Sequence, residues 1–209
     1  MMILTDVYNT ALQGCTNATT LIASSNEFFN NQLSSNGTLY SDLIHSCVID
    51  GAYLSLFTSF EQFLEDSFIC YMLGQAGLNG NSFVKYVSPQ SEDQARSILK
   101  GTGRFADFTN RDTILKLASN FFDNGGTYSY LNSISADFED MKKIRNAISH
   151  ISPESERAFL SLVRVKIGSI PQNITTAMFL NMIMPNTTDT VFSYYESIVR
   201  CAITNIANP

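Results

Sequence analysis

The first 84 residues contain no lysine or arginine, although they hold seven aspartates and glutamates. All thirteen basic residues follow, from Lys85 onward, against twelve acids, so the two parts carry net charges of −7 and +1 and the chain carries −6. Phosphate contacts supply most of the affinity of nonspecific nucleic-acid binding, so this acidity disfavours a protein that coats nucleic acid. It still allows a local basic cleft in the second part.

Long apolar runs, a secretory signal and clustered cysteines are also absent. No apolar run reaches the roughly eighteen residues that predict a membrane-spanning helix. The N-terminus has neither a basic region nor a long apolar run, which disfavours secretion. The four cysteines are scattered, with no C-x-x-C pair and no histidine cluster beside them. The sequence therefore predicts a cytoplasmic protein with no membrane association, no metal, no cofactor and no disulfide framework.

The apolar residues recur at steps of three and four along most of the chain, and no strand pattern is convincing. This periodicity predicts an all-α fold, and 209 residues suit one domain over 1–209. The middle of the second predicted helix is apolar on most sides and should be the most buried. The spacing and the turn residues predict helices over 3–33, 39–73, 91–99, 110–122, 131–150, 153–165, 175–183 and 190–206, with a turn at 34–37.

One segment, D-F-E-D-M-K-K-I-R-N-A-I-S-H-I-S-P over 137–153, combines the residue types that chemistry needs. It holds Arg145, Asn146 and His150, one of only two histidines. Histidine titrates near neutral pH and serves as a general base or acid, while a guanidinium holds a phosphate through two hydrogen bonds. Together they suit attack of a ribose 2′-hydroxyl on the adjacent phosphodiester without a metal, with Asn146 holding an oxygen or orienting the histidine. The alternative is structural, because a histidine at a helix end is often a cap favoured by the dipole.

Helix geometry predicts how Arg145 and His150 are placed. Five residues along an α-helix turn a side chain by roughly 140° and advance it by about 7.5 Å, so the two groups should flank a ridge. A second copy across a two-fold axis would then be needed to close the site. Four basic residues on this helix and the next are predicted to rim the cleft and bind RNA: Lys142, Lys143, Arg157 and Arg164.

Glu61 is the remaining candidate for the site. It lies among Phe57, Phe60 and Phe63 in the second predicted helix. One interpretation is a carboxylate on the edge of an apolar stripe. The other is a buried acid paired with a basic group such as Arg145.

The stretch K-I-R-N-A-I-S-H resembles the R-x(4–6)-H motif of the HEPN superfamily, all-α proteins in which a polar residue often follows the arginine. An aromatic helix with F-E-Q-F-L-E-D lies well upstream, and this order is similar to HEPN families of bacterial toxin and defence loci, including RiboL-PSP. The resemblance covers about 40–165, which would be the core of the domain. Residues 168–209 would be a C-terminal extension with a final helix, for dimerisation or partner binding.

The resemblance implies a HEPN-like bundle of four or five helices, with extra short helices, that forms a homodimer. It implies a metal-independent endoribonuclease, a toxin or antiviral-defence effector, that leaves a 2′,3′-cyclic phosphate. Arg145 and His150 would be catalytic, Asn146 would assist and Glu61 would orient the site. RNA and an antitoxin or defence-system protein would be the partners. Some relatives carry a modifiable tyrosine two residues after the histidine, where this chain has Ser152, which disfavours that mode of neutralisation.

Two alternatives stay open. The first is a non-catalytic HEPN-like module that binds a partner protein or a nucleotide, which the low overall basicity favours. The second is an unrelated helical domain with a chance R-x(4)-H, which a buried His150 would favour.

Overall fold

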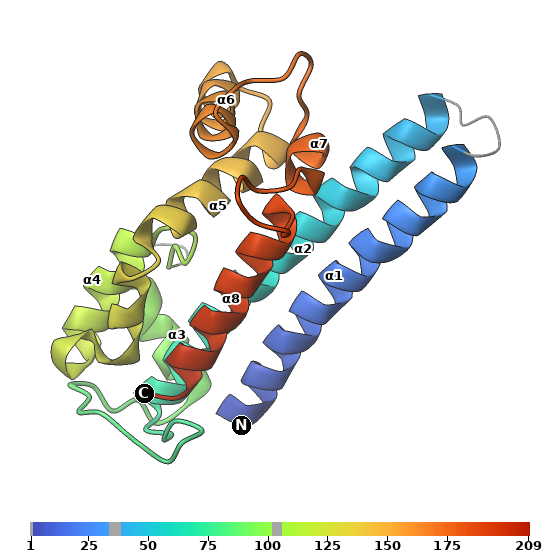
Figure 1. Cartoon of the computed structure of the whole chain (residues 1–209). Helices are drawn as coiled ribbons and strands as arrows, with labels where there is room; N and C mark the ends of the chain where they lie inside the picture. Colours follow the sequence, from blue (N-terminus) through green and yellow to red (C-terminus); the bar gives the residue numbers. More distant parts are fainter. Residues whose placement is uncertain (1, 34–38, 102–105) are drawn as a thin grey trace. The chain divides into compact units, whose positions relative to one another are not determined.

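The computed structural model describes residues 2–33, 39–101 and 106–209 (Figure 1). Within these ranges the chain is all-α, without strands, and has only two isolated bridges, Lys85 with Phe122 and Ile183 with Thr190. The all-α class is therefore confirmed, while the HEPN-like bundle and the dimer stay predictions. The elements are α1 (Leu4–Leu33), α2 (Leu39–Met72), α3 (Glu92–Lys100), α4 (Arg111–Phe121), the 3₁₀ segment η1 (Asp123–Asn132), α5 (Ser135–Ser149), α6 (Pro153–Ile167), α7 (Thr176–Asn181) and α8 (Val191–Ala207).

Polar caps set the starts of several helices, as the sequence predicts. The Ser91 hydroxyl accepts the Gln94 N–H at 3.2 Å at the start of α3, and Ser152 precedes Pro153 at the start of α6. These oxygens satisfy backbone donors that have no partner within the helix. The predicted helices match α1–α4 and α6–α8 to within about two residues at each end. The turn predicted at 34–37 lies outside the described residues.

The prediction that the helix carrying the candidate site begins at 131 is wrong. Residues Asp123–Asn132 form η1, and α5 begins only at Ser135. Within η1, the φ angles of Asn124, Gly125 and Gly126 are 52°, 76° and 53° and lie in the left-handed region. At Gly126 a Cβ atom would lie 2.8 Å from the Phe83 ring, so the close approach of that ring requires glycine there.

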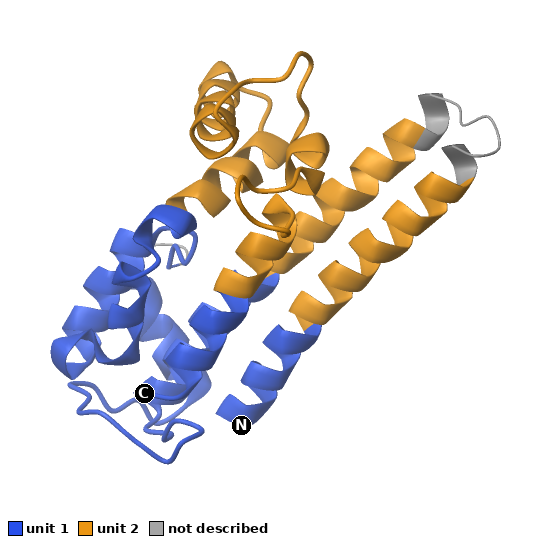
Figure 2. Ribbon diagram, viewed as in Figure 1, with its two compact units in different colours: residues 1–13, 59–138, 199–209 blue, residues 14–58, 139–198 orange. Residues whose placement is uncertain are grey.

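The described chain divides into two compact units, drawn in different colours in Figure 2. The first unit contains Met1–Gln13, Ser59–Phe138 and Val199–Pro209, and the second contains Gly14–Thr58 and Glu139–Ile198. Each unit thus combines segments that are far apart in the sequence. The single domain over 1–209 stays a prediction.

The first unit is built around aromatic rings. Phe68 packs against Phe122 and Tyr128 at centroid distances of 4.8 Å, and against Phe108 and Phe121 at 5.9 and 6.0 Å. The buried Tyr128 hydroxyl is satisfied by a hydrogen bond of 2.9 Å with Ser67. Offset and edge-on ring pairs stabilise a core beyond the area that they bury. The aromatic bulk expected of α2 is thus used for packing.

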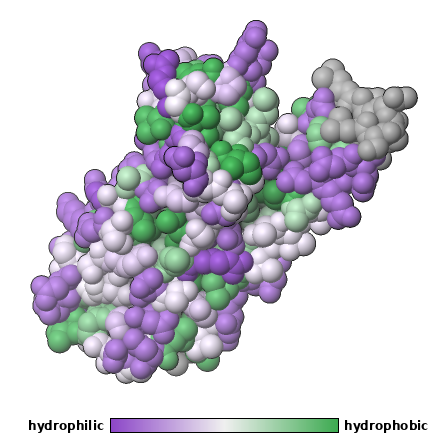
Figure 3. Space-filling model, viewed as in Figure 1, coloured by the Kyte–Doolittle hydropathy of each residue, from purple (hydrophilic) through white to green (hydrophobic). Residues whose placement is uncertain are grey.

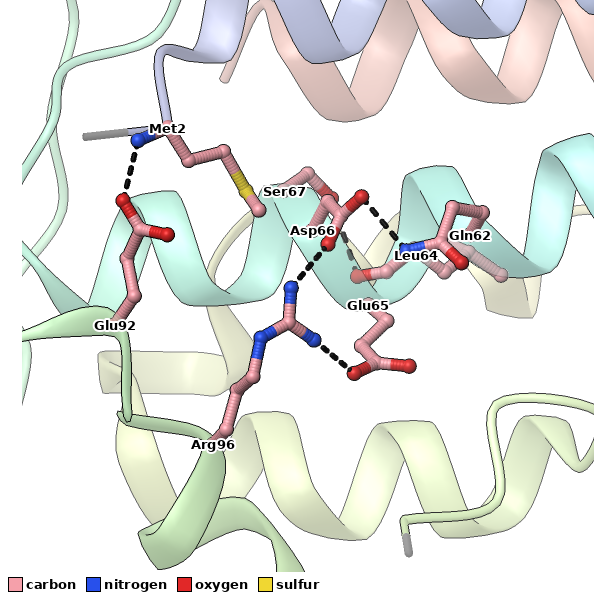
Figure 4. A network of polar contacts seen from close by, with 8 residues as sticks. All are labelled: Met2, Gln62, Leu64, Glu65, Asp66, Ser67, Glu92 and Arg96. Carbon is pink, nitrogen blue, oxygen red and sulfur yellow. Dashed lines mark hydrogen bonds and ion pairs between the residues drawn. The ribbon is translucent and has the colours of Figure 1, made fainter. Parts of the chain in front are cut away.

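Charged groups of the first unit pair with one another (Figure 4). The Arg96 guanidinium on α3 donates to Glu65 and, at 2.9 Å, to Asp66 on α2. Gln62 donates to the other Asp66 oxygen at 2.7 Å. The backbone N–H of Met2 donates to the Glu92 carboxylate in the same network. These contacts fasten α3 to α2 and give Glu65 and Asp66 a structural role.

In the second unit, the buried Asp140 holds α5 and α6 together. One carboxylate oxygen accepts from Lys143 at 2.9 Å, and the other pairs with Lys166 near the end of α6 at 3.0 Å. The buried Tyr53 hydroxyl donates to the Met141 carbonyl at 2.9 Å and so ties α2 to α5. A carboxylate this buried is normally paired, because an isolated buried charge is costly.

By length and composition alone, the stretch Asp42–Met72 of α2 is apolar enough to cross a membrane, alone among the helices that the structure describes. A third of the most apolar stretch of this helix is buried inside the protein. A core helix of a soluble protein passes the same test, so the finding is weak. The cytoplasmic location stays a prediction.

Candidate functional site

The candidate site lies where α5 ends and α6 begins. Ser149 is the last residue of α5, and the His150 N–H still donates to the Asn146 carbonyl at 2.9 Å. The Ser152 N–H donates to the His150 carbonyl at 3.1 Å, and the Ser152 hydroxyl then caps α6. His150 is therefore fixed by backbone hydrogen bonds on both sides, although it is no longer helical.

The structure brings three predicted site residues together within one chain. The Arg145 Nη1 atom lies 3.3 Å from His150 Nε2 and 3.1 Å from Asn146 Oδ1. The prediction that Arg145 and His150 flank a ridge is wrong, because the helical rotation does not extend to a residue beyond the end of α5. The geometric reason for requiring a second copy is thereby removed, while the dimer itself stays a prediction.

The hydrogen bond assigns the protons of the site. A guanidinium has donors and no acceptor, so the Arg145–His150 contact requires an unprotonated Nε2. Nδ1 is then the ring nitrogen that carries the proton. The basic lone pair of His150 therefore faces a cation that also binds phosphate well.

The site is open to solvent. His150 is exposed, whereas Arg145 and Asn146 are half-buried. The next residue, Ile151, is fully exposed at 107%. On the face drawn in Figure 3, hydrophobic and hydrophilic residues are interspersed. A large polymer could thus reach His150, and the burial that would favour a chance motif is not observed.

The four predicted RNA-binding cations differ in their surroundings. Lys143 is held by Asp140, and Arg157 pairs with Glu154 at 3.2 Å while both side chains stay about three-quarters exposed. For Lys142 and Arg164, no ion pair occurs within the residues that the structure describes. Two of the four charges are thus already balanced by nearby carboxylates.

Glu61 and Arg145 belong to different compact units. Glu61 is half-buried on α2 in the first unit, whereas Arg145, Asn146 and His150 belong to the second. Its pairing with Arg145 stays a prediction. Sequence reasoning did not find Lys166, which shares Asp140 with Lys143, because 26 residues separate the partners and no local pattern connects them.

In 2–33, 39–101 and 106–209, no group of three or more histidine, cysteine, aspartate or glutamate side chains could hold a metal ion. Comparison with family models, with curated proteins and with solved structures found no match for this chain. The resemblance to the HEPN superfamily therefore rests on the motif and its helical context.

Proposed function

We propose that the chain is a metal-independent endoribonuclease whose site is formed by Arg145, Asn146 and His150. The observation that supports it best is the 3.3 Å approach of Arg145 Nη1 to an exposed His150 Nε2. Attack by a 2′-hydroxyl needs a base that takes the proton and a cation that holds the phosphate, and this pair of side chains could supply both.

In the proposed reaction, a phosphodiester of the RNA replaces His150 as the acceptor for the Arg145 guanidinium. The freed Nε2 atom takes the proton of the 2′-hydroxyl, the 2′-oxygen bonds to phosphorus, and the bond from phosphorus to the 5′-oxygen breaks. The 5′-oxygen leaves with a proton from water or from His150 of a second copy. The products are a 2′,3′-cyclic phosphate and a 5′-hydroxyl. Arg145 stabilises the charge that builds on the phosphoryl oxygens, and Asn146 holds Arg145 at 3.1 Å.

The biological role that we propose, a toxin or antiviral-defence effector in the cytoplasm, follows from the resemblance. An antitoxin or a defence-system protein would restrain such an enzyme. Homodimerisation would place two copies of the site in one cleft and supply both an acid and a base.

The experiment is cleavage of a labelled RNA by the purified chain and by Arg145→Ala and His150→Ala. Each substitution should lower the rate by at least about 100-fold, the smaller contribution of a general base or of a charge that stabilises the transition state. Arg111→Ala is the control, because Arg111 also pairs with a neighbouring group, Asp112 at 2.6 Å, but lies in the first unit. Cleavage should persist in EDTA.

An RNA cleavage rate that is unchanged in both Arg145→Ala and His150→Ala would contradict the proposal. Arg145→Lys adds a finer test, since lysine keeps the charge and loses the two-pronged geometry. It should retain part of the activity, between the wild type and Arg145→Ala.

A non-catalytic module that binds a partner protein or a nucleotide is the second candidate. The pairing of Lys143 and Arg157 with carboxylates favours it, because it balances two of the four positive charges predicted to bind RNA. Purified protein that never cleaves RNA, yet retains a bound partner or nucleotide, would support this function instead.

A further inference from the structure

The second unit contains a cavity of about 630 Å³ that the proposed ribonuclease reaction does not use. Its walls are the end of α1, the start of α2 and the segment 171–182, which includes α7. This volume is within the range of small-molecule sites, roughly 300–1,000 Å³. The cavity also gives part of the 168–209 segment a defined place in the structure.

One wall is a pair of parallel rings. The Phe29 and His45 rings stack with centroids 4.2 Å apart and an interplanar angle of 5°. His45 Nε2 lies 2.7 Å from Asn26 Oδ1, and since this oxygen only accepts, Nε2 is the donor. In the neutral form of the ring the proton is then on Nε2. Burial lowers the pKa of His45 against the opposing effect of Asp42, which favours the neutral form.

The wall formed by α7 is anchored at both ends. At its start, the Thr176 hydroxyl donates to Asp50 on α2 at 2.7 Å. At its end, the amides of Asn181 and Asn26 bond reciprocally at 3.2 and 3.4 Å. These contacts hold α7 against α1 and α2, so the cavity exists before any ligand binds. A preformed site loses less entropy on binding than one that must be ordered first.

The lining selects the charge of the ligand. Most of it is apolar, from residues such as Ile49, Ile174 and Met178. Among the described residues that line the cavity, Asp42 carries the only formal charge, and none is lysine or arginine. A phosphate or carboxylate would have no cation to pair with and would face a carboxylate, which disfavours anionic ligands.

From these features we infer that the cavity binds a planar, largely apolar small molecule that is uncharged or cationic. The molecule packs against the apolar lining beside the stacked Phe29 and His45 rings. The inference does not rest on the proposed ribonuclease function, because no residue of the Arg145 site lines the cavity.

The test is fluorescence titration of the full chain with Nile red, a neutral planar dye, and with the anionic dye 1-anilinonaphthalene-8-sulfonate. Nile red should bind saturably at one site per chain, at least about tenfold more tightly than the sulfonate. Ser46→Trp places an indole in the cavity and should weaken Nile red binding at least about tenfold. Ser55→Trp is the matched control, since Ser55 lies on the same helix, is exposed and does not line the cavity.

A second variant keeps the test decisive if Ser46→Trp fails to fold. Asp42→Lys reverses the charge at an exposed position and should reverse the preference, with sulfonate binding strengthened about tenfold and Nile red binding little changed. Absence of saturable Nile red binding would overturn the inference. So would equal binding by the Ser46→Trp and Ser55→Trp variants, or a sulfonate affinity that Asp42→Lys leaves unchanged.

Discussion

The two histidines occupy contrasting regions of the second unit. His150 is exposed and contacts Arg145, between the end of α5 and the start of α6. His45 is half-buried, stacks on Phe29 and is held by Asn26 beside a mostly apolar cavity. The Arg145 contact makes Nε2 of His150 an acceptor, whereas the Asn26 contact makes Nε2 of His45 a donor.

The neighbours of each histidine therefore determine its chemical role. The basic nitrogen of His150 faces a guanidinium that can be drawn away by a phosphate, so it suits proton transfer. The ring of His45 is fixed by stacking and by an amide, so it suits binding. Four predictions test this contrast between the two histidines.

The largest effect should come from comparing the two histidines directly. His150→Ala should lower RNA cleavage by about 100-fold or more, because it removes the general base, whereas His45→Ala should leave the rate within about threefold. Circular dichroism should show that both variants remain helical. Equal losses in the two variants would mean that His150 has no special part in the chemistry.

Asp140→Ala removes the carboxylate that holds α5 and α6 together. Lys143 and Lys166 lose their partner, and the free energy of unfolding should fall by about 2–3 kcal/mol, below the value for a fully buried pair because Lys143 is 41% exposed. RNA cleavage should fall as well, because the turn that carries His150 follows α5. Denaturant unfolding measures the first effect, and Glu139→Ala, an exposed neighbour, should change it by less than about 0.5 kcal/mol.

Asn26→Ala tests the other region. It removes the acceptor of His45 Nε2 and one partner of the Asn181 amide, which should lower the free energy of unfolding by about 1–2 kcal/mol. Nile red binding should weaken while RNA cleavage stays unchanged. Asn9→Ala, an exposed change on the same helix, serves as the control. Loss of cleavage in Asn26→Ala would show that the two regions are not functionally separate.

The smallest effect should appear in the pH dependence of stability. Burial lowers the folded-state pKa of His45 below its ordinary value of 6.5, so this group stabilises the fold above that pH and the stabilisation is lost as the pH falls through the lowered pKa. Asp50 acts in the opposite sense, because burial raises its pKa against the hydrogen bond from Thr176. Thermal unfolding between about pH 7.5 and pH 5 should show a smaller acid-induced fall in Tm for His45→Asn than for the wild type.

Most of the fold follows from local signals in the sequence. The helix ends at Ser91 and Ser152–Pro153 are set by side chains within three residues of the backbone donors that they satisfy, so the sequence predicts them well. The η1 segment before α5 is different, because Asn124, Gly125 and Gly126 take left-handed conformations and Gly126 meets the Phe83 ring. That contact depends on tertiary packing and cannot be seen in a local pattern.

The geometry of the candidate site is also only partly predictable from local sequence patterns. The residue types of Arg145, Asn146 and His150 point to phosphate chemistry from sequence alone. Their mutual contact does not follow from an ideal helix, because α5 ends one residue before His150. The cavity beside His45 was missed altogether, since its walls come from segments that are up to 155 residues apart. No periodicity connects such segments before the chain folds.

The reciprocal amide pair of Asn26 and Asn181 has a consequence for the order of events during synthesis. A contact across 155 residues forms only after the ribosome has released both partners, long after α1 and α2 have emerged. Until then the Phe29–His45 rings lack their α7 wall. A molecule that fits the cavity would therefore bind only chains that have been translated past residue 182, and its binding would shift the equilibrium toward those that have completed their fold.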